Sequence, residues 1–271
     1  MLAQSFPSPE GRGDQRGEDK VRERKKGVKT KLPGNVKTTF TRRLLAWWAR
    51  AARDLPWRQT RDPYRVLVSE FMLQQTQVSR VAEYYPRFLK RFPDLETLAR
   101  AKPRAVREAW EGLGYYARAR NLHSLANQVA GKGDAGDGVP TLPDDPAELI
   151  KLPGIGPYTA GAVASFAYER PVPAVDTNVA RVITRVFLGN SRQRRSGNRQ
   201  RLIWSLAAAL VPKTGKRAWK FNQAIMELGA LICVARKPKC PQCPVRPVCK
   251  TGRVVSSARV NSRLGSPRKR G

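Results

Sequence analysis

The sequence has little histidine, few acidic residues and no long apolar run, and each shortage excludes a class of protein. A single histidine, His123, argues against catalysis by a histidine base. No stretch reaches the roughly 18 apolar residues of a membrane-spanning helix, and no apolar segment follows a charged N-terminus, so we expect neither a membrane protein nor a secreted one. The 21 acidic residues are too few for an acid-rich disordered chain.

Positive charge dominates the part of the chain that we expect to fold. The 271 residues carry a formal net charge of +31, and residues 41–250 hold 36 of the 52 basic and 16 of the 21 acidic residues. Because the excess does not come from the ends alone, it predicts a polyanionic partner, most simply nucleic acid bound through its phosphates. The alternative is a basic protein that is merely soluble.

Helical patterns fill the chain between two basic arms. Residues 1–37 and 251–271 are rich in basic and turn-forming residues and predict disordered arms. Between them, apolar residues recur at helical spacing, without sustained alternation of period two. We therefore expect an all-α fold. One helix is expected to begin after Thr39 and another to run unbroken over residues 64–85.

All four cysteines lie within 17 residues near the end of this helical region. In a chain without a secretory signal, thiolates this close together ordinarily hold a metal rather than form disulfides. Tetrahedral zinc and a [4Fe-4S] cluster both accept four thiolates, and the spacing does not choose between them. The candidate ligands are Cys233, Cys240, Cys243 and Cys249.

A glycine-containing turn is expected at Leu152–Gly161, LPGIGPYTAG, where one predicted helix follows another. Such a turn exposes backbone N–H groups at the start of the second helix, where an anion is favoured. We assign Gly154, Gly156 and Thr159 to the binding of DNA phosphate on this basis. The alternative is an ordinary tight turn whose glycines supply positive φ angles.

Acid and base chemistry then falls to carboxylates, two of which stand in apolar surroundings. Glu70 lies in VLVSEFML, and Asp176 lies at a predicted helix start in PVPAVDTNVARV. Partial desolvation would raise the pKa of Glu70 and suit it to donate a proton near neutral pH. The alternatives are a paired buried acid for Glu70 and a helix cap for Asp176.

Taken together, these strings resemble the helix-hairpin-helix DNA glycosylases with a C-terminal iron–sulfur loop, and specifically the mismatch-specific adenine DNA glycosylases of the MutY type. The resemblance covers about residues 40–250. Besides the glycine turn and the cysteine spacing, its carriers are DLPWR at 54–58, SEFMLQQTQV at 69–78, GLGYYARARNLH at 112–123, AVDTNV at 174–179 and FNQAIMELGALIC at 221–233.

The resemblance implies an organisation and a cofactor. It implies a six-helix domain over residues 63–171 and a second helical domain made of residues 38–62 and 172–250, with a base pocket between them. It also implies a [4Fe-4S] cluster rather than zinc. Many adenine glycosylases of this type continue into a domain that recognises 8-oxoguanine, and we expect that domain to be absent because the sequence ends 22 residues after Cys249.

The resemblance further implies roles for single residues. Glu70 would protonate an adenine flipped out of the duplex, and Asp176 would stabilise or trap the oxocarbenium-like sugar before water completes hydrolysis. Related enzymes that also cut the strand carry a lysine where this chain has Tyr158, so we expect release of the base alone. The other implied positions are Asn178 beside Asp176, Arg58 and Glu227 in the adenine pocket, and Gln75 and Tyr115 as wedges in the vacated stack.

Three functions follow as hypotheses. The leading one is hydrolysis of the N-glycosidic bond of adenine mispaired with 8-oxoguanine or guanine, which leaves an abasic site. The second is removal of thymine or uracil opposite guanine, and the third is a non-catalytic architectural DNA binder. For the leading function we expect a monomer that binds mismatch-containing double-stranded DNA and does not bind membranes. If the source is bacterial, we expect it in the cytoplasm, associated with the nucleoid.

Overall fold

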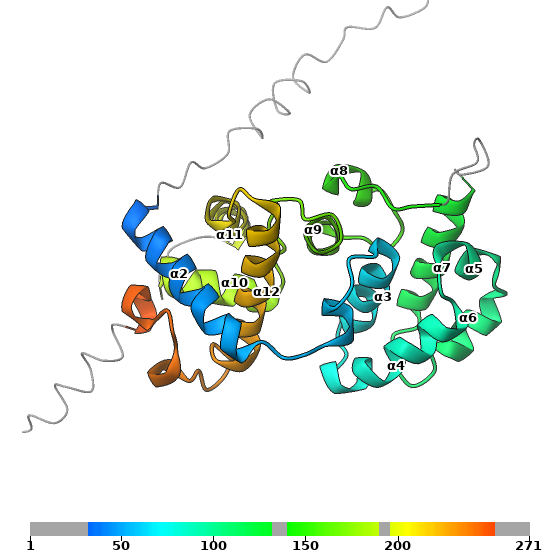
Figure 1. The fold of residues 1–271 in the computed structure, drawn as a ribbon, viewed down its shortest axis with the longest axis horizontal. Coiled ribbons are helices and arrows are strands. Elements are labelled where there is room, and N and C mark those ends of the chain that lie inside the picture. Colours follow the sequence, from blue (N-terminus) through cyan, green and yellow to red (C-terminus); the bar gives the residue numbers. More distant parts are fainter. Residues whose placement is uncertain (1–31, 132–139, 190–195, 253–271) are drawn as a thin grey trace, which may run out of the picture.

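The structure is a computed structural model that describes residues 32–131, 140–189 and 196–252. Within these ranges the chain forms helices joined by turns and no strand, so the expected all-α fold is confirmed (Figure 1). None of the described helices is both long enough and apolar enough to cross a membrane. Most of the two predicted arms lies outside the described residues.

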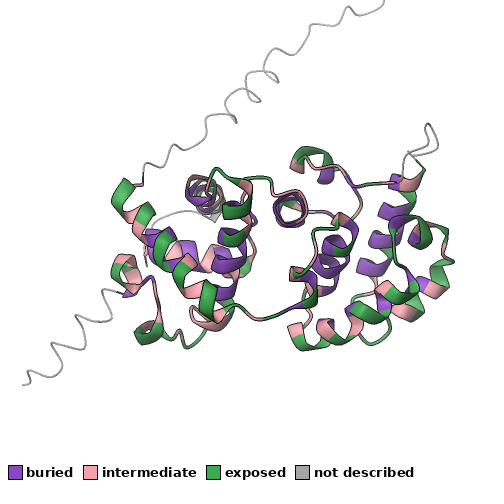
Figure 2. Ribbon diagram, viewed as in Figure 1, coloured by how far each residue is buried: buried purple, intermediate pink, exposed green. Residues whose placement is uncertain are grey.

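One group of helices packs around a buried cluster that contains Phe71, Trp110 and Leu122. Figure 2 shows the buried faces of these helices turned toward one another. The group comprises α3 (Pro63–Leu73), α4 (Val78–Arg91), α5 (Leu95–Arg100), α6 (Pro103–Ala109), α7 (Ala117–Ala130), α8 (Pro146–Leu149) and α9 (Pro157–Phe166).

A second group packs around another buried cluster, which contains Phe40, Ile183 and Phe221. The short helix η1 (Pro56–Arg58) lies on the segment that joins the two groups. The predicted domain boundaries are not fixed by these clusters and stay a prediction. The second group comprises α2 (Gly34–Ala51), α10 (Thr177–Ile183), the π-helical η3 (Thr184–Leu188), α11 (Ser196–Leu210), α12 (Gly215–Leu231), η4 (Cys240–Gln242) and η5 (Arg246–Val248).

Helix starts follow the local chemistry of the sequence. At α5 the side chain of Asp94 accepts a hydrogen bond of 2.7 Å from the backbone N–H of Thr97, and at α3 Asp62 accepts one of 2.9 Å from Arg65. Each bond satisfies a backbone donor that has no partner within the helix. Pro63 and Pro103 occupy the first positions of α3 and α6, where a missing N–H has no cost.

The predicted single helix over residues 64–85 is wrong. The chain leaves the helix after Leu73 and re-enters it at Val78, and Gln75 in the intervening turn has a φ of 57°. The last carbonyls of α3 accept hydrogen bonds from the guanidinium of Arg118 on α7. A distant side chain therefore caps α3, and the pattern within residues 64–85 contains no sign of it.

The predicted arms are also too long at their inner ends. Helix α2 begins at Gly34 rather than after Thr39, because Leu32 and Val36 pack against the second buried cluster. At the other end, the hydroxyl of Thr251 donates a hydrogen bond of 2.9 Å to the carbonyl of Arg185. The remaining residues of both arms, 1–31 and 253–271, lie outside the described part of the chain.

Candidate active site

A cavity of about 890 Å³ is lined by residues of both helix groups. Its volume lies in the range of sites that hold small molecules or nucleotide bases. Residues from α3, α9, α11 and α12 line it, together with the start of α10 and the segment around η1. It brings together seven of the residues predicted from the sequence, which are Arg58, Glu70, Gln75, Tyr158, Asp176, Asn178 and Glu227.

Glu70 lines this cavity and is almost as deeply buried there as Glu227. It lies on α3 with 4 % of its surface exposed, and its Oε2 accepts a hydrogen bond of 2.7 Å from the hydroxyl of Tyr158. The pKa of Glu70 is raised to about 7, and burial is the largest cause. The hydrogen bond from Tyr158 lowers this pKa, whereas the charge of Asp176 raises it further. A carboxyl group with this pKa is substantially protonated at neutral pH and can act as a general acid.

Tyr158 remains a neutral phenol in this setting. It lies in the first turn of α9, and burial, followed by the nearby charges of Glu70 and Asp176, raises its pKa well above its ordinary value. The hydroxyl therefore donates to Glu70 rather than losing its proton. A phenol in this state is a poor nucleophile.

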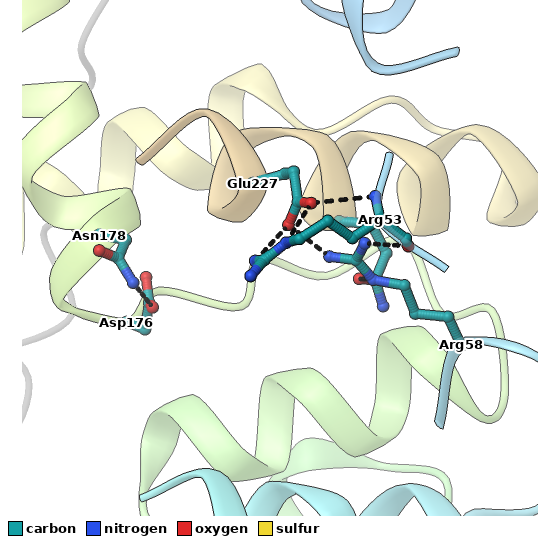
Figure 3. Close-up of polar contacts among 6 residues, drawn as sticks. Arg53, Arg58, Asp176, Asn178 and Glu227 are labelled. Atoms are coloured by element: carbon teal, nitrogen blue, oxygen red, sulfur yellow. Dashed lines mark hydrogen bonds and ion pairs between the residues drawn. The ribbon is translucent and has the colours of Figure 1, made fainter. Parts of the chain in front are cut away.

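Asp176 is a helix cap and a cavity residue at once. Its Oδ1 accepts from the backbone N–H of Val179 at 2.7 Å. Its Oδ2 accepts from the side-chain amide of Asn178 at 2.8 Å, as Figure 3 shows. Burial raises the pKa of Asp176, and these hydrogen bonds offset only part of the rise. The N-terminus of α10 adds a favourable dipole for the ionised form, so the carboxylate has direct support at the edge of the cavity.

Glu227 accepts hydrogen bonds from Arg53 and Arg58, and the sequence indicated only Arg58 as a site residue. Its Oε1 accepts from Nε of Arg53 and its Oε2 from Nη2 of Arg58, each at 2.8 Å (Figure 3). Burial alone would raise the pKa of Glu227, but the hydrogen bonds from Arg53 and Arg58 lower it to about 2. Glu227 is thus a carboxylate with both oxygens occupied. Arg53 lies 174 positions away, and no local pattern links the two.

Further polar contacts run from Asp176 toward the cysteine segment. The amide oxygen of Asn178 accepts from Nη2 of Arg181 at 2.6 Å, and Nε of Arg181 donates to the carbonyl of Cys233 at 2.8 Å. Arg181 was not predicted as a site residue. Its place one turn after Asn178 on α10 is the only sequence feature that could have suggested it.

The two predicted wedge residues lie on separate turns. Gln75 lines the cavity, whereas Tyr115 is not among its lining residues. Tyr115 is 62 % exposed and, with Ile150, is one of two large hydrophobic side chains exposed in the described ranges. Both residues have left-handed backbone, with φ of 57° for Gln75 and 48° for Tyr115.

The glycine turn is built as expected, away from the cavity. Gly154 has a φ of 76°, and a Cβ there would lie 2.7 Å from Cβ of Asn121, so this position requires glycine. Gly156 is the N-cap of α9. Thr159, in the first turn of α9, is 3 % exposed, so little of it is open to a phosphate in this structure. Phosphate binding by this turn stays a prediction.

The four cysteines surround a second, smaller cavity. All are free thiols, and together they line a space of about 80 Å³. Arg185 donates to Sγ of Cys233 at 3.4 Å, and the backbone N–H of Gly252 donates to Sγ of Cys249 at 3.3 Å. Burial, together with the neighbouring thiols, raises the pKa of Cys243 to about 11, so this thiol keeps its proton at neutral pH unless a metal binds it.

This arrangement of thiols can be compared with what each metal group needs. Among the described residues, no three His, Cys, Asp or Glu side chains converge as ligands of a single metal ion. The donor set itself, four thiols around one space of about 80 Å³, is of the kind that both zinc and a [4Fe-4S] cluster accept.

Comparison with known proteins finds relatives that match most of this chain. Residues 68–208 match the family model of the HhH-GPD superfamily base excision DNA repair proteins. The chain is 42 % identical over 238 residues to an adenine DNA glycosylase of Rattus norvegicus, covering 85 % of this chain and 45 % of that protein. It is 46 % identical over 203 residues to an adenine DNA glycosylase of Mycolicibacterium smegmatis, covering 74 % of this chain and 66 % of that protein.

A solved structure extends the comparison to the fold. A thermostable thymine-DNA glycosylase superposes with a TM-score of 0.72 at 31 % identity, covering 81 % of this chain and 98 % of that one. The chain thus spans nearly the whole of this structure but only about half to two thirds of the two curated relatives. The match of the family model over more than half of its residues shows that the chain belongs to the HhH-GPD superfamily of base excision DNA repair proteins.

Proposed function

We propose that this protein is a DNA glycosylase that hydrolyses the N-glycosidic bond of adenine mispaired with 8-oxoguanine or guanine and leaves an abasic site. The observation that carries the proposal is that one cavity holds both a buried Glu70, whose pKa is about 7, and Asp176, whose carboxylate caps α10. The names of the relatives, adenine DNA glycosylases of a mammal and a bacterium, support adenine as the target.

The two acids divide the chemistry. Protonated Glu70 gives its proton to a ring nitrogen of the adenine, and the electron pair of the glycosidic bond then leaves with the base. The sugar becomes oxocarbenium-like, and the carboxylate of Asp176 stabilises it or bonds to it. Water attacks the sugar carbon, displaces the carboxylate of Asp176 where it has bonded, and gives its proton to the ionised Glu70, which restores both acids and completes the hydrolysis.

Tyr158 accounts for release of the base without cutting of the strand. An enzyme that cuts the strand by this route needs an amine to form a Schiff base with the sugar. The phenol of Tyr158 has a pKa well above its ordinary value and is already bonded to Glu70. The product is accordingly an intact strand that carries an abasic site.

The location of the cavity requires the target nucleotide to leave the duplex. Glu70 is 4 % exposed, so a stacked base cannot reach it and must be extruded. We assign Gln75 and Tyr115 to the space that the base vacates, and the backbone around Gly154 and Gly156, with the basic surface, to the phosphates. The partner is double-stranded DNA that contains a mismatch, bound by a monomer.

We also propose that Cys233, Cys240, Cys243 and Cys249 hold a [4Fe-4S] cluster. The four cysteines would bind such a cluster as thiolates, and bonding to iron would stabilise the thiolate form that burial disfavours at Cys243. The carbonyl of Cys233 accepts from Arg181 and Arg185, so this chain's own residues hold the first ligand against α10 and η3.

Removal of thymine or uracil opposite guanine is the second candidate. It is favoured by the thymine-DNA glycosylase of nearly equal extent, to which this chain is 31 % identical. Glu227 and the MLQQT segment that includes Gln75 favour adenine, because they match the adenine glycosylase pattern.

One experiment separates the candidates. The protein is incubated with duplexes that contain A:8-oxoguanine, A:G, T:G or U:G, the released bases are identified, and alkali then reveals abasic sites. The proposal expects adenine from the first two duplexes and strand breaks only after alkali. Release of thymine or uracil without adenine would replace it by the second candidate. Release of no base from any duplex, with binding intact, would leave an architectural DNA binder.

A further inference from the structure

Two turns that carry the predicted wedge residues share one buried arginine. The first turn follows α3 and contains Gln75, and the second precedes α7 and contains Tyr115. Gln75 and Tyr115 are two of only three non-glycine residues with positive φ in the described ranges. Such backbone is unfavourable for a residue with a side chain and persists only where neighbouring contacts hold it.

Arg118, in the first turn of α7, supplies those contacts on both sides. Its Nη1 donates to the carbonyls of Phe71, Met72 and Gln74, at 2.9, 2.7 and 2.6 Å. Its Nη2 donates to the hydroxyl of Thr76 at 3.1 Å and to the carbonyls of Leu113 and Gly114, each at 3.0 Å. One rigid guanidinium thus bonds to both neighbours of Gln75 and to the residue before Tyr115.

Arg118 is a buried cation held by hydrogen bonds rather than by a counter-charge. It is 7 % exposed, and no carboxylate of the described residues forms an ion pair with it. A buried cation without a counter-charge is costly, and its hydrogen bonds to five backbone carbonyls and one hydroxyl offset that cost. The planar guanidinium also fixes the geometry of the two turns, because its donors point in set directions.

The second turn also accepts hydrogen bonds from two other side chains. Nε of Arg80 on α4 donates to the carbonyl of Gly112 at 2.7 Å, and the indole N–H of Trp110 donates to Gly114 at 3.3 Å. The Arg118 guanidinium lies 5.4 Å from the ring centre of Trp110 and 5.6 Å from that of Tyr115. The carbonyls of the three residues before Tyr115 thus all accept hydrogen bonds. They hold the backbone of this turn, while the side chain of Tyr115 stays largely exposed.

We propose that Arg118 is a positioning residue that sets Gln75 and Tyr115 at a fixed separation, so that the two enter the duplex together when the target nucleotide leaves it. Arg118 touches neither the DNA nor the base and acts only through the two turns. This inference rests on the proposed function, because it assigns a device for extrusion to the same site. It predicts that replacing Arg118 slows the release of adenine only from DNA in which a base pair has to be opened.

The test compares Arg118→Lys and Arg118→Met with the matched control Arg120→Lys, a change at an exposed position of the same helix. Single-turnover release of adenine is measured from a duplex with an A:G pair and from a duplex with the adenine in a one-nucleotide bulge. We expect both Arg118 variants to lose about tenfold or more on the A:G duplex, as misplaced groups commonly do, and to keep the wild-type rate on the bulge. The control should match the wild type on both.

A second readout does not need the chemistry. Each variant is combined with Glu70→Gln, and the fluorescence of 2-aminopurine placed beside the target adenine reports its extrusion. The fluorescence rise should be smaller in both Arg118 variants than in the Glu70→Gln parent. If the wild type releases no base at all, the proposed function fails while this fluorescence comparison still tests the inference.

Three outcomes would overturn the inference. Equal losses on the A:G duplex and the bulge would show that Arg118 acts on Glu70 through the end of α3 rather than on extrusion. Wild-type rates and fluorescence in both variants would show that the two turns need no common support. Failure of both variants to fold, judged by circular dichroism and thermal unfolding, would show a structural role only.

Discussion

The hydroxyl of Tyr158 donates a hydrogen bond of 2.7 Å to Oε2 of Glu70, 88 positions earlier in the chain. This bond opposes the burial of Glu70, since it favours the ionised carboxylate while burial favours the neutral acid. The balance leaves the pKa of Glu70 at about 7, where a general acid is most effective at neutral pH.

Replacement of Tyr158 by phenylalanine should raise the pKa of Glu70 above about 7, because it removes the hydrogen bond that lowers it. The active form is the protonated acid, so the rate falls as pH rises through this pKa. The falling limb of the single-turnover pH profile should therefore move to higher pH in Tyr158→Phe. Tyr168→Phe is the control, since its hydroxyl donates to the carbonyl of Leu142 and it does not line the cavity. A limb that stays in place or moves to lower pH contradicts the assignment.

Glu70→Gln should make the protein more stable at alkaline pH. The pKa of Glu70 rises from an ordinary 4.5 to about 7 on folding, so its ionisation destabilises the folded state as pH rises from about 4.5 through 7, and not below. The gain in the free energy of unfolding should reach about 3 kcal/mol above pH 8 and vanish below pH 4.5. Urea unfolding across this range measures it, with Glu111→Gln at an exposed position as control. A gain that does not change with pH would be inconsistent with a buried acid of raised pKa.

Asp176→Asn should distinguish the role of Asp176 as the N-cap of α10 from its role in the reaction. Asparagine caps helices about as well as aspartate, so α10 and the thermal unfolding temperature should be preserved. Without the carboxylate, the developing positive charge on the sugar loses its partner, and the single-turnover rate should fall by about a hundredfold or more. A variant that keeps the wild-type rate would remove Asp176 from the mechanism.

Glu227→Gln should destabilise the fold by about 2 kcal/mol near neutral pH, because it leaves the guanidinium of Arg58 without its counter-charge. The pKa of Glu227 is held at about 2, below its ordinary value of 4.5, so this stabilisation is present above pH 4.5 and is lost as pH falls toward 2. Denaturant unfolding at several pH values measures both effects.

The matched control for that change is Glu169→Gln. Glu169 pairs with Arg61 at 3.5 Å, and both side chains are about a third or more exposed, so its loss should cost under about 1 kcal/mol. An equal cost for both substitutions would show that the pairs with Arg53 and Arg58 add nothing beyond a surface ion pair.

Cys240→Ser should reduce the iron and acid-labile sulfide bound to the purified protein and weaken its visible absorbance. Loss of one of four thiolates breaks a bond that the cysteine segment depends on, so its resistance to proteolysis should fall as well. Metal analysis of the wild type is the direct check. One zinc ion per chain, with no iron, would replace the cluster by a zinc site.

Much of the helical structure follows from local patterns, because caps such as Asp94 and the apolar spacing of α7 and α12 act within a few residues. The break after Leu73 could not be predicted, since the guanidinium that holds it comes from Arg118, 46 positions after Met72. The same limit applies to the site. The apolar setting of Glu70 is visible in the sequence, whereas the pairing of Glu227 with Arg53 spans 174 positions and depends on the packing of α2 against α12.

The single-turnover release of adenine from an A:8-oxoguanine duplex by the wild type and by Glu70→Gln, with binding to the same duplex measured in parallel, tests the central claim most directly. Glu70→Gln should bind this DNA as the wild type does and release adenine at least about a hundredfold more slowly. Release at the wild-type rate by Glu70→Gln would contradict the account, because it would show that no proton from Glu70 is needed.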